Sequence, residues 1–164
     1  MKMEKRYILD FFKQKNISPR LINKGESEKI IKRMISIANG DKLHYLWSNY
    51  KSNSFIIQKK ISCNLDLYIK TLHNVIIFND MYFIIDKVCF SDFNDNLVMK
   101  LSKAELVELL YEFYWELDEI YIFDIDFNFF ISLNHNFELS LYGNKRLDLC
   151  KKTVEKIETS SCNV

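Results

Sequence analysis

The stretch that decides the fold runs from Ser102 to Leu133 and reads SKAELVELLYEFYWELDEIYIFDIDFNFFISL. It opens with a capping box, in which the Ser102 oxygen accepts from an orphan amide of the first helical turn while Glu105 reaches back to the serine amide. Apolar residues then recur at helical spacing as far as Leu117. Two runs of β-branched and aromatic residues follow, over residues 119–123 and 127–133. The turn between them is too short for parallel strands, so the stretch predicts a helix followed by an antiparallel hairpin.

Similar patterns extend to both sides of this stretch. A further strand over 137–142 makes the hairpin a meander, in which residues 120–123 are apolar on both parities and predicted to be central, while 127–133 is predicted to be mostly one-sided. Gly40 is placed to end the second helix and Asn64 to cap the third. The expected helices span 2–15, 27–38, 65–72 and 145–158, and the other expected strands span 75–78, 82–85 and 97–101, with short strands near Tyr45, Trp47 and 55–57.

Length and composition fit one compact domain. The chain has 164 residues, of which 48% are hydrophobic and 15% aromatic, with 3 Gly and 1 Pro, so it can bury a sizeable core and is not a disordered chain. We therefore predict a single α+β domain over residues 1–164, with an antiparallel sheet packed against about five helices. Its N-terminal part, 1–40, is helical and basic, and the polar tail, 159–164, is expected to fray.

Nothing in the sequence indicates a membrane or an oxidising compartment. Asp10 interrupts the first apolar residues too early for a signal peptide, and no apolar run approaches the roughly 18 residues of a membrane span. The cysteines, Cys63, Cys89, Cys150 and Cys162, stand far apart without a CxxC pair, so they are expected to be free thiols. We expect a soluble, cytoplasmic protein.

The charges are separated along the chain although the total is +1. Residues 1–60 hold 14 Lys and Arg against 5 acids, giving +9, whereas residues 92–126 hold 2 Lys against 10 acids, giving −8. Such a separation can place a field of several kT at one face, which speeds and orients association with an oppositely charged partner.

Part of the acidic block forms a stripe on the predicted helix. Its glutamates recur at spacings of three and four, opposite the apolar side, and only Lys103 interrupts them. A solvated helix face is the plain interpretation, but like charges four residues apart destabilise a helix, so a retained stripe is a candidate docking surface for a basic protein. The candidate contact residues are Glu105, Glu108, Glu112, Glu116, Asp118 and Glu119.

No constellation points to catalysis, a metal or a cofactor. Asp124, Asp126 and Asn128 open like a calcium loop, but Phe129 stands where a glycine must turn the chain and His135 where a glutamate should chelate, so a hairpin turn is favoured. The three histidines, His44, His73 and His135, lack zinc-ligand spacing. No phosphate-binding glycine loop and no nucleophile elbow are present. We expect no catalytic residue, no metal and no cofactor.

A resemblance to a known family rests on three motifs. They are Leu46-Trp47 with Tyr50, the hairpin 119–130, and Asn134-His135 followed by Leu141-Tyr142-Gly143. Over residues 46–143 the chain resembles small immunity proteins of bacterial polymorphic and contact-dependent growth inhibition toxin systems. That family commonly has a tryptophan in place of Phe129 or Phe130, and a second His and an Asp where this chain has Asn136 and Phe137. The resemblance implies an α+β fold and a toxin-binding role, and it supplies no catalytic residue.

Three hypotheses follow. The leading one is an immunity protein, an antitoxin that neutralises a cognate toxin domain, for example a basic nuclease, by stoichiometric binding through the acidic surface. The second is a nucleic-acid-binding module that uses the basic residues 1–60 with Tyr45, Trp47 and Tyr50 as stacking groups, although the acidic block would repel the same polyanion. The third is a small hydrolase, which would need a pocket joining His135 to a cysteine or carboxylate.

Overall fold

The structure, a computed structural model, describes residues 3–44, 46, 54–57, 64–76, 79–91, 95–117, 119–134, 139–143 and 147–161. Its α-helices are α1 (Lys5–Gln14), α2 (Lys24–Ile37), α4 (Leu65–Val75), α5 (Lys103–Phe113) and α6 (Leu147–Ser161). Its strands are β1 (Arg20–Leu21), β2 (Ser54–Ile57), β3 (Asp80–Ile85), β4 (Leu97–Ser102), β5 (Ile120–Asp124), β6 (Phe129–Leu133) and β7 (Leu139–Gly143). The predicted α+β class is confirmed.

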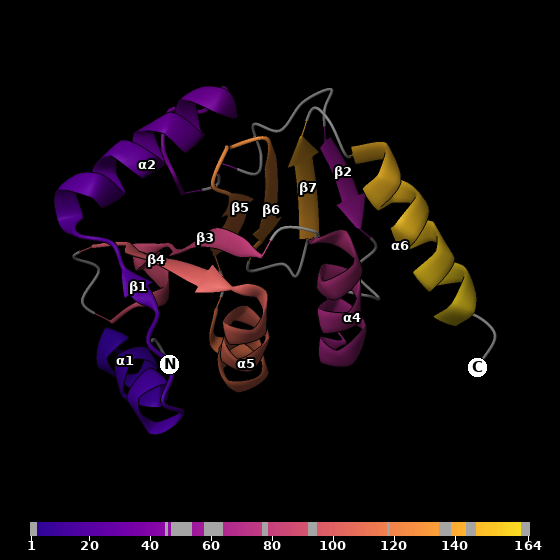
Figure 1. Ribbon diagram of the computed structural model, residues 1–164. Helices are drawn as coiled ribbons and strands as arrows, with labels where there is room; N and C mark the ends of the chain where they lie inside the picture. Colours follow the sequence, from indigo (N-terminus) through magenta and orange to yellow (C-terminus); the bar gives the residue numbers. More distant parts are fainter. Residues whose placement is uncertain are drawn as a thin grey trace.

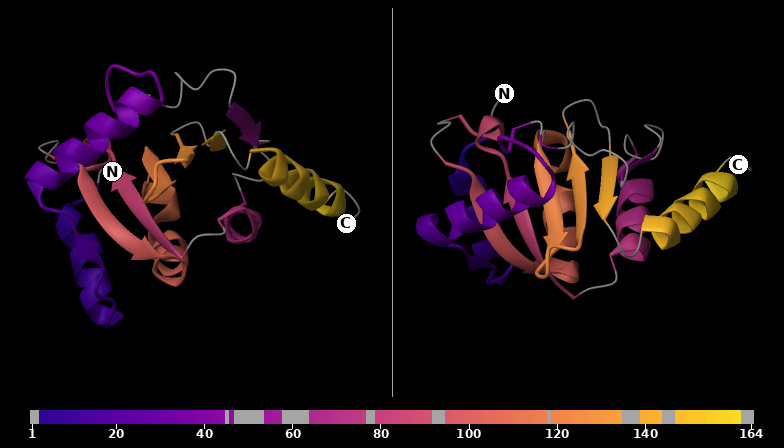
Figure 2. Two further views of the ribbon diagram at one scale, coloured as in Figure 1. Left: turned by 45° about the horizontal axis from the view of Figure 1, so that its top comes forward. Right: turned by 90° about the horizontal axis from the view of Figure 1, so that it is seen from above.

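All strands join one antiparallel sheet in the order β1-β4-β3-β5-β6-β7-β2 (Figure 1). β4 and β5 both pair with β3 and run antiparallel to it, so they are parallel to each other, and α5 is the crossover between them. β5, β6 and β7 form the predicted meander. In both views of Figure 2, α6 lies at the opposite end of the sheet from α1 and α2.

Helices cover both faces of the sheet and create two cores. On one face, α1, α4 and α5 pack on Phe83, Ile122 and Ile131. On the other face, α2 packs through Ile30, Met34 and Ala38 on Tyr121 and Phe123. None of the helices in the described ranges has the length and apolarity that crossing a bilayer requires.

The central position of β5 confirms one sequence prediction, whereas β6 contradicts another. β5 has three strands on each side, and residues Ile120–Phe123 are all buried. β6 was expected to be one-sided, yet all of its residues, Ser132 included, are buried. The reason is that the α2 layer extends over β6, where Phe130 packs in the second core.

Several boundaries differ from the prediction because helical periodicity continued further than expected. α4 runs to Val75, which continues the buried row of Ile69 and Leu72, so the strand predicted to start at Val75 is wrong. α2 begins three residues earlier than expected, because the Asn23 side chain accepts from the Glu26 amide. The left-handed residue that follows α2 is Asn39, with a φ of 54°. Gly40, which was predicted to end the helix, does not have a positive φ.

Other local predictions are confirmed. Ser102 and Glu105 form the capping box of α5, and Asn64 caps α4. Asp124 serves the hairpin turn, since its Oδ1 accepts from the amides of Asn128 and Phe129 at 2.8 and 3.0 Å. Tyr45, Trp47 and Tyr50 lie outside the described residues.

Two glycines allow a matched test of the packing. A Cβ on Gly143 would lie 2.8 Å from the Asn128 carbonyl oxygen and from a Phe129 ring carbon, whereas a Cβ on Gly25 would meet only Asn23 Oδ1 at 3.7 Å. We expect Gly143→Ala to lower the free energy of unfolding by about 1–3 kcal/mol through overpacking. Gly25→Ala should leave it unchanged or raise it by about 0.5 kcal/mol, because alanine favours helix. Urea denaturation of both variants measures this, and equal effects would contradict it.

Candidate functional site

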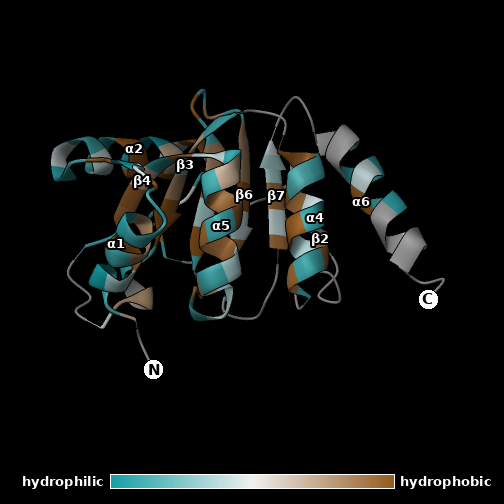
Figure 3. Cartoon of the chain, turned by 60° about the horizontal axis from the view of Figure 1, so that its bottom comes forward, coloured by the Kyte–Doolittle hydropathy of each residue, from teal (hydrophilic) through white to brown (hydrophobic). Residues whose placement is uncertain are grey.

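The outward side of α5 and the 3₁₀ turn after it (η3, Tyr114–Glu116) carries acids together with exposed aromatic rings. Tyr111 and Trp115 are 52% and 55% exposed, and they are among the few exposed large hydrophobic residues in the described part of the chain. The exposed Glu108 and Glu112 lie four residues apart on one side of α5, and the exposed Glu116 follows four residues later in η3. We call these five residues the α5 ridge. Figure 3 views α1, α5 and α4 from their outer side.

The structure places the predicted contact residues in different environments. Glu105 is half-buried, and its carboxylate accepts from the Ser102 amide at 2.6 Å, so it serves as a cap. Glu108 lies 3.6 Å from Lys15 of α1. Glu112 and Glu116 are exposed and have no ion pair among the described residues. Asp118 lies outside the described residues.

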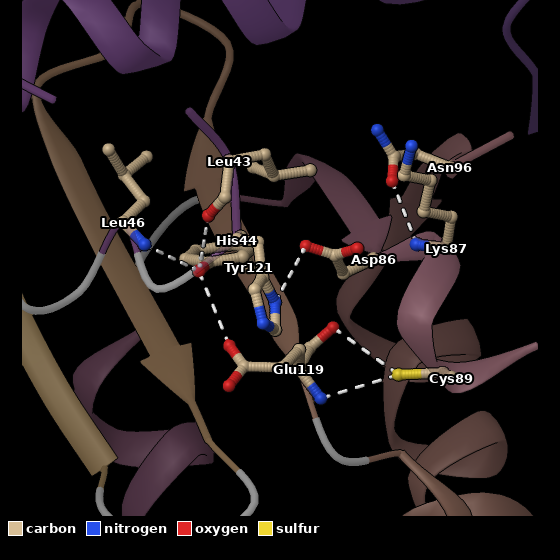
Figure 4. Close-up of polar contacts among 9 residues, drawn as sticks. All are labelled: Leu43, His44, Leu46, Asp86, Lys87, Cys89, Asn96, Glu119 and Tyr121. Carbon is tan, nitrogen blue, oxygen red and sulfur yellow. Dashed lines mark hydrogen bonds and ion pairs between the residues drawn. The ribbon is translucent and has the colours of Figure 1, made fainter. Parts of the chain in front are cut away.

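The prediction that Glu119 contacts a partner at the surface is wrong, because this residue is only 1% exposed. It comes one residue before β5. Its carboxylate lies 3.4 Å from the hydroxyl oxygen of Tyr121, which bonds Leu43 and Leu46 after α2 (Figure 4). Sequence reasoning assumed that a carboxylate next to Asp118 would be solvated. The buried position follows from strand alternation, which places Glu119 on the same face as Tyr121.

The aromatic part of the α5 ridge was missed by the sequence analysis. The signal was present, since Tyr111 and Trp115 are four residues apart and alternate with Glu108 and Glu112. Trp115 is supported from behind: its ring packs edge-on against buried Tyr114, with centroids 4.8 Å apart, and Tyr114 packs against Tyr68 of α4. Burial raises the pKa of the Tyr68 hydroxyl well above its usual value, so this ring is a neutral part of the core.

The neighbours of the ridge differ on its two sides. Toward α1, the rings of Phe11 and Phe113 meet edge-to-face with centroids 5.3 Å apart. Toward the C-terminal end of α4 there is an open groove of about 560 Å³. The ridge therefore stands between a packed helix on one side and a hollow on the other.

A second feature is a buried polar cluster at one end of the sheet, on the α2 side (Figure 4). It holds Asp86 and Glu119, and Ser132 and Ser140 lie beside Tyr121 on the neighbouring strands; these four are among the seven buried polar residues found among the described residues. Ser132 pairs with Tyr121 and with Ser140 across the strands, which places all three on one face.

Tyr121 uses this cluster to hold the segment after α2. Its hydroxyl donates to the Leu43 carbonyl at 2.8 Å and accepts from the Leu46 amide at 3.1 Å. Its oxygen also lies 3.4 Å from Glu119 Oε2. One buried side chain thus bonds two backbone groups that are 75 or more residues away in sequence.

Further contacts in the cluster join His44 to Asp86 and Cys89 to Glu119. His44 Nδ1 lies 3.7 Å from Oδ2 of buried Asp86. Cys89 accepts from the Glu119 amide through its sulfur at 3.3 Å and donates its S–H to the Glu119 carbonyl at 3.7 Å. No group of three or more potential metal ligands occurs in the parts of the chain that the structure describes. His135, on which the hydrolase hypothesis depends, lies outside those parts.

Some of the basic N-terminal residues lie on α2, away from α5. Exposed Lys29, Lys32 and Arg33 lie on α2, which covers the face of the sheet opposite to α5. Arg33 also sits over the Phe127 ring, 4.3 Å from its centroid. The stacking groups of the nucleic-acid hypothesis, Tyr45, Trp47 and Tyr50, are not among the described residues.

Comparisons of the chain with protein-family models, curated proteins and solved structures give no match.

The role of Tyr121 can be measured against a matched control. Tyr121→Phe removes a hydroxyl that bonds the Leu43 carbonyl and the Leu46 amide, which stay bonded to each other at 2.8 Å, so we expect a loss of about 0.5–1.5 kcal/mol of unfolding free energy. Tyr111→Phe removes the same atom from a ring that is 52% exposed and should change stability by less than about 0.5 kcal/mol. Urea titrations followed by fluorescence give both values. Similar small losses in the two variants would contradict the proposed role of Tyr121.

Proposed function

We propose that this chain is an immunity protein that neutralises a cognate bacterial toxin domain with a basic surface, by stoichiometric binding through the α5 ridge. The observation that carries the proposal is the combination of exposed Tyr111 and Trp115 with Glu108, Glu112 and Glu116 on one helix side. As part of the proposal the protein acts in the cytoplasm and transforms no substrate. The resemblance over residues 46–143 to immunity proteins of toxin systems supports this role.

The aromatic residues provide the apolar part of such an interface. Trp and Tyr are enriched among the residues that dominate binding energy, where they lie at the centre of an interface and are surrounded by polar groups. Trp115 packs edge-on against Tyr114, which in turn packs against Tyr68, so its ring rests on a buried support. A supported aromatic ring is a suitable anchor.

The carboxylates provide attraction and orientation. Glu112 and Glu116 are exposed, and complementary charge raises association rates by roughly 10- to 1,000-fold, an effect that salt weakens. α2, with its exposed Lys29, Lys32 and Arg33, lies across the sheet from α5 (Figure 1). These cations repel a basic partner from the α2 face, while on the ridge side Lys15 stands beside Glu108.

The test uses the protein encoded directly upstream of this gene, because immunity genes stand beside the toxin genes. We expect Trp115→Ala to weaken its binding at least 30-fold, equivalent to about 2 kcal/mol. Reversing Glu112 and Glu116 together to lysine should slow association at least tenfold at low salt. Biolayer interferometry over a salt series measures both effects, and circular dichroism verifies that the variants are folded.

Asp148→Lys with Glu155→Lys is the matched control. Both residues are exposed on α6, at the other end of the sheet, and the pair changes the net charge by the same amount. We expect at most a small change in association rate. Equal effects of the two double reversals would show that only net charge matters, and unchanged binding of all variants would refute the α5 ridge as the interface.

A further inference from the structure

The groove beside the α5 ridge has a distinct lining. It lies between the C-terminal end of α4 and the first turns of α5, with a volume of about 560 Å³. Ala104 and Val107 give it an apolar wall, and Glu108 is the single carboxylate among the described residues that line it. The remaining lining residues are His73, Asn79, Ser102 and Lys103.

Lys103 does not neutralise that carboxylate, because its ammonium group is used elsewhere. Nζ donates to the Ile76 carbonyl at 2.8 Å and also to the His73 carbonyl, at the end of α4. Burial lowers the pKa of Lys103, but hydrogen bonds to helix-end carbonyls keep the ammonium in place. Lys103, the lysine that lines the groove, thus bonds carbonyl groups at the C-terminal end of α4.

The cation that Glu108 contacts comes from outside the groove. Lys15, at the end of α1, places its Nζ 3.6 Å from Glu108 Oε2, and the two side chains are 51% and 52% exposed. A pair this exposed contributes little to stability and exchanges its partners readily. Lys15 therefore competes with any other cation for Glu108.

We propose that this groove receives an arginine side chain of the basic partner, and that Lys15 occupies the Glu108 carboxylate until the arginine arrives. An arginine has an apolar stem that fits Ala104 and Val107, and a planar head that can bond a carboxylate through two N–H groups. A purely apolar side chain would remove water from Glu108 without a bond in return, which is costly. The inference rests on the proposed function, since it concerns the same partner and the same helix.

A small-molecule probe tests the groove without the partner. We expect N-acetyl-argininamide at millimolar concentration to shift the amide NMR signals of His73, Asn79 and Val107. Glu108→Gln should weaken this binding at least threefold, since it keeps the shape and removes the charge. N-acetyl-norleucinamide, which has a stem without a charged head, should produce no such shifts. Equal shifts from both probes, or no effect of Glu108→Gln, would overturn the inference.

Lys15 offers a second readout with a matched control. Lys15→Gln should tighten binding of both N-acetyl-argininamide and the upstream protein by about two- to fivefold, the fold-change that corresponds to loss of one exposed ion pair. Lys13→Gln changes the net charge equally, but Lys13 lies 3.4 Å from Asp10 and should have less effect. Equal tightening by the two variants would refute competition at Glu108.

The two proposals can fail separately. If Trp115→Ala abolishes binding of the upstream protein while Glu108→Gln and Lys15→Gln change nothing, the groove inference is wrong and the interface stands. If the groove binds N-acetyl-argininamide while the ridge variants bind the upstream protein normally, the proposed function is wrong and the arginine site stands.

Discussion

The burial of β5 on both faces is the constraint on which the rest of the structure depends. Residues Ile120–Phe123 are all buried, so each side of the sheet must carry a helical layer. α5 covers one side through Leu106, Leu109 and Leu110 and carries the chain from β4 to β5. That position leaves only the opposite side of α5 free to meet another molecule, which is where the α5 ridge lies.

The second face of β5 explains the buried polar cluster. On that side the cover consists of α2 and the segment after it, and this segment has backbone groups that need partners once water is excluded. The Leu46 amide donates to the Leu43 carbonyl at 2.8 Å, and the Tyr121 hydroxyl bonds both of these groups as well. The neighbouring Glu119 and Asp86 are buried in the same polar surroundings. The side chains at this end of the sheet therefore make hydrogen bonds that apolar side chains could not make.

Local signals in the sequence predicted the elements whose causes are local. The capping box at Ser102, the cap at Asn64 and the Asp124 turn depend on residues within five positions, and all three were confirmed. The errors concern contacts made over a long sequence separation. Glu119 and Ser132 were taken as exposed or one-sided because nothing near them in sequence shows that residues 43–46 and α2 lie above them. The capping box already assigned Glu105 to the Ser102 amide, whereas the glutamate spacing predicted an acidic face but not the exposure of Trp115.

The position of the acids along α5 separates a local role from a binding role. Glu105, in the first turn, is favoured by the positive end of the helix dipole and by its bond to the Ser102 amide. Glu112, in the last turn, and Glu116, just beyond it, lie at the negative end, and the last turn of α5 has no basic residue. Helix stability therefore accounts for Glu105 and opposes Glu112, whose repulsion from Glu108 adds to the cost. These residues stand beside exposed Tyr111 and Trp115, and the binding of a basic partner that we propose would use both the charges and the rings.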